Sequence, residues 1–148
     1  MPVMTIPPRL DPCLQDWEVS AHLHADAHAP RLCRRAVTGV VREYGVPGVA
    51  EDGALVAGEL MTNAVQHGLG PVAFRVAWYA VRARLRLTVW DEGKGRAPVR
   101  PREPGPDAEH GRGLLIVSAL AADWGQYSTP SGGKAVWAEL APCGDGFC

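Results

Sequence analysis

The stretch from residue 92 to residue 113 cannot form regular secondary structure, and it divides the chain in two. It holds four prolines among glycines and charged residues: Pro98, Pro101, Pro104 and Pro106. Proline lacks a backbone N–H and its ring blocks the interior of a helix, and it also interrupts the hydrogen bonds of a sheet. The elements that bury the core must therefore come from residues before 92 and after 113.

Hydrophobic periodicity predicts these elements. Alternating apolar residues predict strands, and apolar residues three and four apart predict amphipathic helices. Strands are expected at 17–25, 72–79, 85–91, 124–129 and 135–140, and helices at 28–44, 51–67 and 114–122. This order predicts an α+β fold, a two-layer α/β sandwich with helices on one face of a mixed or antiparallel sheet. The five tryptophans fall in or beside the strands and are expected in the core.

The chain of 148 residues fits one domain, expected at 16–141 between a lead-in (1–15) and a tail (142–148). Fifteen basic and sixteen acidic residues leave a net charge of −1, which argues against nucleic acid as the main partner. No apolar run predicts a membrane span and the first residues do not form a secretory signal, so we expect a cytoplasmic protein. Its four cysteines, including Cys143 and Cys148 in the tail, have no C-x-x-C spacing. Reduced thiols are expected.

Three polar residues follow one face of the predicted helix 51–67. Glu59, Asn63 and His67 are four residues apart, so each is rotated by only about 40° from the last. The stripe borders apolar neighbours, and asparagine is a poor residue for a helix interior. An amide oxygen suits Mg²⁺, and a carboxylate one turn away can accept a proton. The alternative is an ordinary solvated helix face.

A second polar site follows the strand 85–91. Asp91 ends that strand, and Gly93 and Gly95 come directly after it. A carboxylate at this place can accept a hydrogen bond from the exocyclic amine of adenine, and the glycines let the backbone approach a flat ligand. The alternative is a simple turn that closes the strand.

The third site is the sequence Gly111-Arg112-Gly113-Leu114, which leads into the helix expected at 114–122. Backbone N–H groups at the start of a helix favour anions, so this junction predicts a phosphate contact. A glycine-rich junction without chemical consequence is the alternative.

Other nucleotide and metal sites have less support. Gly133-Lys134 lacks the spacing of a P-loop, and neither G-x-G sequence continues as a dinucleotide-binding motif. His22, His24 and His28 are either metal ligands or, as is more common, an exposed strand edge.

In their order and spacing, E-x-x-x-N-A-x-x-H-G, D-x-G-x-G and G-x-G-L resemble the motifs of the GHKL, or Bergerat-fold, ATPases. The chain is most similar to the anti-sigma factor serine/threonine kinases and related actinomycete ATP-binding regulators. The resemblance covers about residues 17–140. Lys134 departs from the family pattern, because relatives often carry threonine there, near the adenine.

The resemblance implies ATP and Mg²⁺ as cofactors. Asn63 is then the Mg²⁺ ligand and Glu59 the general base, while Asp91 binds the adenine amine beside Gly93 and Gly95. Gly111, Arg112, Gly113 and Leu114 form the hinge of an ATP lid, and His67 orders the phosphate side of the site.

The function implied is a protein serine/threonine kinase that phosphorylates a STAS-type anti-anti-sigma partner and binds a sigma factor. No direct contact with nucleic acid or membrane is expected, and a homodimer is possible within the family. The alternatives are a non-catalytic ATP-binding module of the same fold and a detached histidine-kinase catalytic domain.

Overall fold

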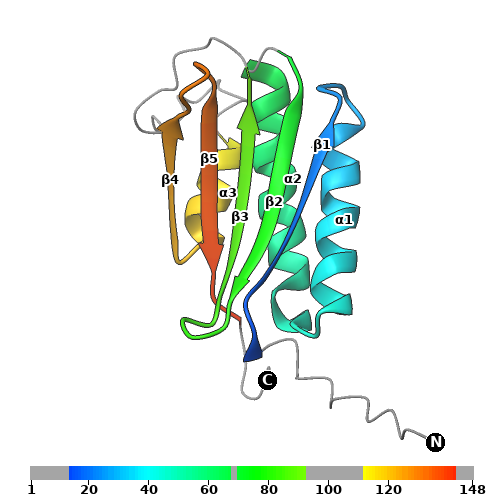
Figure 1. The fold of residues 1–148 in the computed structure, drawn as a ribbon, viewed down its shortest axis with the longest axis vertical. Coiled ribbons are helices and arrows are strands. Elements are labelled where there is room, and N and C mark those ends of the chain that lie inside the picture. The colour runs from blue at the N-terminus through cyan, green and yellow to red at the C-terminus, as the bar shows by residue number, and fades with distance from the viewer. Residues whose placement is uncertain (1–13, 68–69, 93–111, 143–148) are drawn as a thin grey trace, which may run out of the picture.

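The computed structural model describes residues 14–67, 70–92 and 112–142. In this part of the chain five strands form one sheet, and the helices lie along one of its faces (Figure 1). The elements are β1 (Trp17–Leu23), α1 (Ala29–Glu43), the short 3-10 helix η2 (Pro47–Val49), α2 (Ala50–His67), β2 (Val72–Tyr79), β3 (Arg84–Asp91), α3 (Arg112–Leu120), β4 (Asp123–Ser128) and β5 (Lys134–Leu140).

The strand order is β1-β2-β3-β5-β4, and all four pairings are antiparallel. Short turns join β2 to β3 and β4 to β5, so each pair reverses direction directly. Two helices separate β1 from β2; the first carries the chain back along the sheet and the second returns it, so β2 runs opposite to β1. The α+β, two-layer architecture is confirmed, and the described sheet is antiparallel rather than mixed.

The core lies between the helices and the inward face of the sheet. On α1 the buried positions recur every four residues, as its amphipathic pattern predicts: Ala29, Cys33, Val37 and Val41. The side chains of Leu60 and Met61 on α2 are fully buried, as is Trp78 on β2. Because α2 is buried between α1, α3 and β3, it is the element that holds the two layers together.

The other face of the sheet is lined by arginine and tryptophan. Trp90 and Trp137 lie there half-buried, because alternation along β3 and β5 turns them away from the helices. The guanidinium of Arg75 lies 5.5 Å from the Trp90 ring, and that of Arg86 lies 4.3 Å from the Trp137 ring. The expectation of a core position is therefore wrong for these two tryptophans, although it is right for Trp78.

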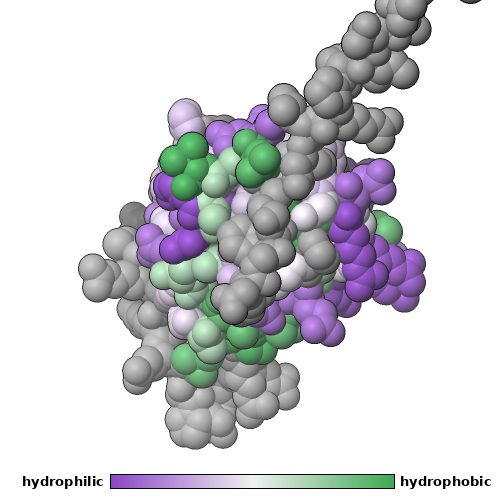
Figure 2. All heavy atoms as spheres, turned by 90° about the horizontal axis from the view of Figure 1, so that it is seen from below, coloured by the Kyte–Doolittle hydropathy of each residue, from purple (hydrophilic) through white to green (hydrophobic). Residues whose placement is uncertain are grey.

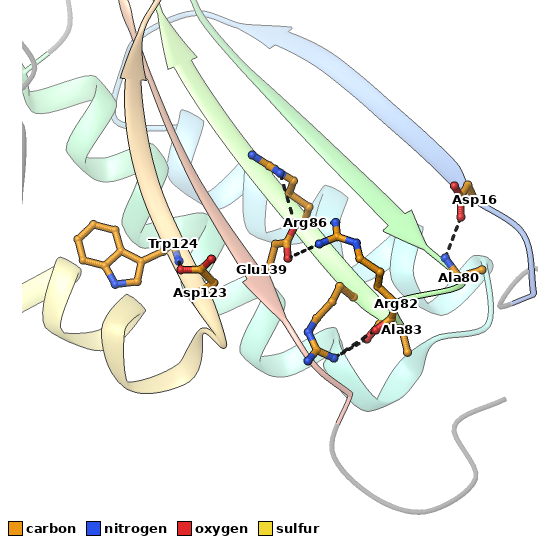
Figure 3. Close-up of polar contacts among 9 residues, drawn as sticks. Asp16, Ala80, Arg82, Ala83, Arg86, Asp123, Trp124 and Glu139 are labelled. Carbon is orange, nitrogen blue, oxygen red and sulfur yellow. Dashed lines mark hydrogen bonds and ion pairs between the residues drawn. The ribbon is translucent and has the colours of Figure 1, made fainter.

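A buried carboxylate helps to close this face. Glu139 is 6% exposed and accepts hydrogen bonds from Arg82 at 2.8 Å and from Arg86 at 3.4 Å (Figure 3). Two guanidinium groups compensate for the desolvation of one carboxylate. The two arginines also lie over aromatic rings of this face, Arg82 over Tyr79 and Arg86 over Trp137.

Two elements differ from their expected bounds by two residues. β1 ends at Leu23 rather than at residue 25, because Asp26 forms a turn: its carboxylate accepts the His28 N–H at 2.8 Å. α3 begins at Arg112 rather than at residue 114, so Gly113 lies inside its first turn. Among the described residues, no helix is long and apolar enough to cross a membrane.

Burial raises the pKa of the Cys33 thiol to about 12, an effect that the positive charge of Arg34 reduces. The unfolded chain would ionise this thiol near pH 9, whereas the folded chain keeps it neutral. The thiol therefore makes its full contribution to the free energy of unfolding below pH 9. Above pH 9 this contribution falls by roughly 1 kcal/mol per pH unit, up to about pH 12. Urea unfolding between pH 8 and 11 should show a steeper loss for wild type than for Cys33→Ala; equal slopes would contradict this prediction.

Candidate functional site

The fold brings two of the predicted polar sites to one end of the sheet. α2 runs beside β3, and the last turns of α2 lie at the same end as the tip of β3 (Figure 1). Val72 begins β2 five residues after α2 ends at His67, and it pairs with Asp91 at the tip of β3. The helix stripe and the strand-end carboxylate are therefore neighbours.

Glu59 and Asn63 lie one turn apart on α2, and both are half-buried. They border the buried residues Leu60 and Ala64, so the stripe lies at the edge of the core, as expected. Neither side chain makes a hydrogen bond or ion pair with another described residue. One carboxylate and one amide thus lie one helical turn apart with no polar partner among the described residues.

The start of α3 packs directly on Glu59. A Cβ placed on Gly113 would lie 2.7 Å from Oε2 of Glu59, closer than real Cβ atoms approach an oxygen. A side chain at residue 113 would therefore displace the carboxylate. The sequence pattern assigns this glycine to a phosphate-binding junction, whereas the geometry gives it a second reason: it leaves room for Glu59 against α3.

Asp91 is 3% exposed at the end of β3. It shares the inward face with Val89 and Leu87, two and four residues earlier on the strand, so its carboxyl points to the helix layer. A carboxylate buried this deeply needs a polar counterpart. The backbone ladder places Lys134 of β5 opposite Asp91, and this lysine is also buried, at 6% exposed.

Gly133 is the residue whose importance the sequence pattern did not reveal. A Cβ on Gly133 would overlap the backbone carbonyl oxygen of Asp91 and lie 3.2 Å from Cα of Glu92. Gly132 beside it has φ +88°, so the pattern of two consecutive glycines already marks a turn. Only the packing of the two strands in the structure shows that Gly133 leaves space for the end of β3 at Asp91.

For the other predicted site residues, the structure gives a position in a helix or does not describe the residue. Leu114 is half-buried in the first turn of α3, while His67 ends α2 and Arg112 begins α3. Gly93, Gly95 and Gly111 lie outside the described residues.

The histidines near β1 do not form a metal site within the described ranges. His22, His24 and His28 line an open pocket of about 560 Å³ together with Asp26 and apolar neighbours. No group of three or more histidine, cysteine or carboxylate side chains in the described part of the chain is placed to hold a metal ion. All three histidines are exposed, at or near the end of the edge strand β1.

The donor set at the sheet end fits a magnesium nucleotide. Mg²⁺ keeps most of its water and needs only one or two protein oxygens, which the Asn63 amide can supply. The adjacent Glu59 carboxylate can accept a proton. The buried Asp91 carboxylate can accept a hydrogen bond from an amino group.

Comparison with known proteins agrees with the fold. The model of the family described as "Histidine kinase-like ATPase domain" matches residues 23–140. No curated protein matches the chain at a significant level. Among the solved structures that match is that of the RsbU and RsbW domains of Rv1364c from Mycobacterium tuberculosis, with 17% identity and a TM-score of 0.61. The match covers 84% of this chain and 32% of the solved chain.

Proposed function

The chain belongs to the histidine kinase-like ATPase domain family, and from this premise we propose that it is a protein kinase that uses Mg·ATP. One observation above all supports a catalytic role rather than nucleotide binding alone. The Glu59 carboxylate lies against the first turn of α3, at a glycine that leaves it room, and one helical turn from the Asn63 amide. A base and a metal ligand side by side are the groups that transfer to a hydroxyl requires.

Each residue has a proposed task. Asn63 would hold the magnesium ion, which when bound neutralises charge on the phosphates. Asp91 would accept the adenine amine, and its burial would make that hydrogen bond selective. Glu59 would take the proton from the acceptor hydroxyl. His67, Arg112 and Leu114, with Gly93, Gly95, Gly111 and Gly113, would line the phosphate side and the lid.

The partners belong to the same proposal. The motifs resemble those of the anti-sigma factor kinases, and the described fold is similar to that of a solved chain containing an RsbW domain. We therefore extend the proposal to a STAS-type anti-anti-sigma protein as the phosphate acceptor and to a sigma factor as the protein held. The regulation of transcription would follow from the choice between these two partners.

The test is transfer of label from γ-labelled ATP, with Mg²⁺, into the proteins of an extract from the source organism. Acid-stable label on a small protein is expected, because phosphoserine and phosphothreonine survive acid. Acid-labile label would instead indicate histidine-kinase chemistry. ATP binding without any label would favour the non-catalytic module and reject the kinase.

Replacing Asp91 with asparagine should weaken ATP binding by roughly tenfold or more, because a buried charged acceptor is lost. The preference for ATP over GTP should shrink too, since guanine has a carbonyl oxygen where adenine has its amine and that oxygen repels a carboxylate. Titration calorimetry with both nucleotides measures this. Asp123→Asn, at an exposed carboxylate on β4, is the matched control. Unchanged nucleotide preference in Asp91→Asn would remove Asp91 from adenine recognition.

A further inference from the structure

Four arginines form a stripe along the solvent side of α1. The arginine stripe consists of Arg31, Arg34, Arg35 and Arg42, all exposed, within a helix whose opposite face is buried in the core. With about 100° between successive residues, the four lie within an arc of about 100°. Seen from below, the flank on which α1 lies in Figure 1 is strongly hydrophilic (Figure 2).

No carboxylate of the described residues forms an ion pair with the stripe. None of the ion pairs in the described part of the chain involves these four arginines; they are formed by Arg75, Arg82 and Arg86 on the sheet. Arg31 and Arg35 are four residues apart, a spacing at which like charges repel on a helix. Arg31 also lies in the first turn of α1, which has no acidic residue and where a positive charge opposes the helix dipole. Arg42 in the last turn of α1 favours the helix dipole and Arg31 lies 3.3 Å from Nδ1 of His28, but no described carboxylate pairs with the stripe.

A groove runs along the same surface. It has a volume of about 340 Å³ and is lined by Arg34, Arg35, Thr38, Gly39 and Arg42. A Cβ on Gly39 would meet nothing within 4 Å, so no contact inside the described chain requires a glycine in this helix. Glycine lowers the stability of a helix interior relative to alanine. At this position it leaves the floor of the groove without a side chain.

The neighbouring helix shapes the edge of this groove. A Cβ on Gly58 of α2 would lie 2.8 Å from Cγ and Cδ of Arg34, so the arginine lies flat across α2. Leu55, one turn earlier on α2, is 43% exposed, and Leu32 on α1 is 47% exposed. The arginine stripe thus lies between one exposed leucine on α2 and another that lines the pocket beside β1.

We propose that this surface binds an acidic, amphipathic segment of a partner protein. Carboxylates spaced like the turns of a helix would face the arginines, and apolar side chains would cover Leu55 on α2. A nucleic acid offers phosphates but no matching apolar contacts, and the net charge of −1 gives no long-range attraction to it. The proposal stands apart from nucleotide binding and phosphoryl transfer, so it does not depend on the proposed function.

The probe is a synthetic peptide helix with glutamates along one face and leucines beside them. The comparison peptide has the same composition, with the glutamates distributed around the helix. Binding to the full chain is measured by fluorescence anisotropy, and amide shifts of the isotope-labelled chain locate the site. We expect the striped peptide to bind at least tenfold more tightly and to shift residues of α1 and the start of α2.

Two variants separate a site from general attraction. Arg35→Glu should weaken peptide binding by about tenfold or more, whereas Arg75→Glu, the same charge change on the far face of the sheet, should change it by less than about twofold. Gly39→Leu keeps every charge and fills the groove, so it should weaken binding equally. Its thermal midpoint should not fall, because an added side chain there meets open space.

Several results would overturn the proposal. Equal affinity for both peptides, or equal loss in Arg35→Glu and Arg75→Glu, would mean that only net charge matters. Tighter binding of duplex DNA or of vesicles containing phosphatidylserine through the same residues would assign the surface to those ligands. A lower thermal midpoint in Arg35→Glu would show that the stripe stabilises the isolated chain.

Discussion

Replacing Glu59 with glutamine is expected to reduce phosphoryl transfer by about 10²–10⁴-fold, because an amide cannot accept the proton of the attacking hydroxyl. ATP affinity should stay within about twofold of wild type, since glutamine has nearly the same size and no contact to nucleotide is assigned to residue 59. Single-turnover transfer from labelled ATP measures the first quantity, and titration calorimetry measures the second. A variant that transfers at the wild-type rate would reject Glu59 as the base.

Two further variants make this test specific. Glu51→Gln changes an exposed glutamate in the first turn of the same helix and should leave transfer unchanged. Gly113→Ala would bring a Cβ within 2.7 Å of Oε2 of Glu59, so the carboxylate must move while the helix gains a better helix-forming residue. If Gly113→Ala transferred phosphate more slowly but was as stable as wild type, the position of the Glu59 carboxylate would matter, and not only its charge.

Gly133→Ala should be the most destabilising of the small substitutions. The added Cβ would overlap the backbone of Asp91, and backbone cannot turn away as the end of a flexible side chain can. We expect a loss of about 3 kcal/mol in the free energy of unfolding, or a thermal midpoint lower by about 6–12 °C. Weaker ATP binding should accompany it, because the end of β3 that carries Asp91 would be displaced.

The control for this substitution is Gly39→Ala, the same change at a helix position where the added Cβ meets nothing within 4 Å. It should raise stability by about 0.5–1 kcal/mol through helix propensity. If both variants were equally stable, the close approach of Gly133 to Asp91 would not affect the free energy of unfolding.

Periodicity predicted the order and type of the elements because each one has a distinct apolar spacing. Alternation in 85–91 places Leu87, Val89 and Asp91 on one face, and the structure has that face inward. The four-residue spacing of Glu59 and Asn63 likewise places both at the edge of the core on α2. Features that depend on one local period were therefore predictable.

Features that depend on two elements were not. Trp90 and Trp137 are hydrophobic enough for a core, yet they lie on the open face because arginines from neighbouring strands cover them. The contact between Gly113 and Glu59 joins residues far apart in sequence, and so does that between Gly133 and Asp91. A residue pattern carries no information about which backbones meet, so such glycines resemble ordinary turn residues.

The position of β5 has a consequence for the way this chain is made. β5 lies between β3 and β4, although both precede it in the sequence. While the polypeptide emerges from the ribosome, β3 can pair with β2 but keeps its other edge unpaired until β5 has been synthesised. An unpaired edge rich in leucine and valine is a template for association with other chains. Newly made molecules are therefore most vulnerable to aggregation in the interval between synthesis of β3 and insertion of β5.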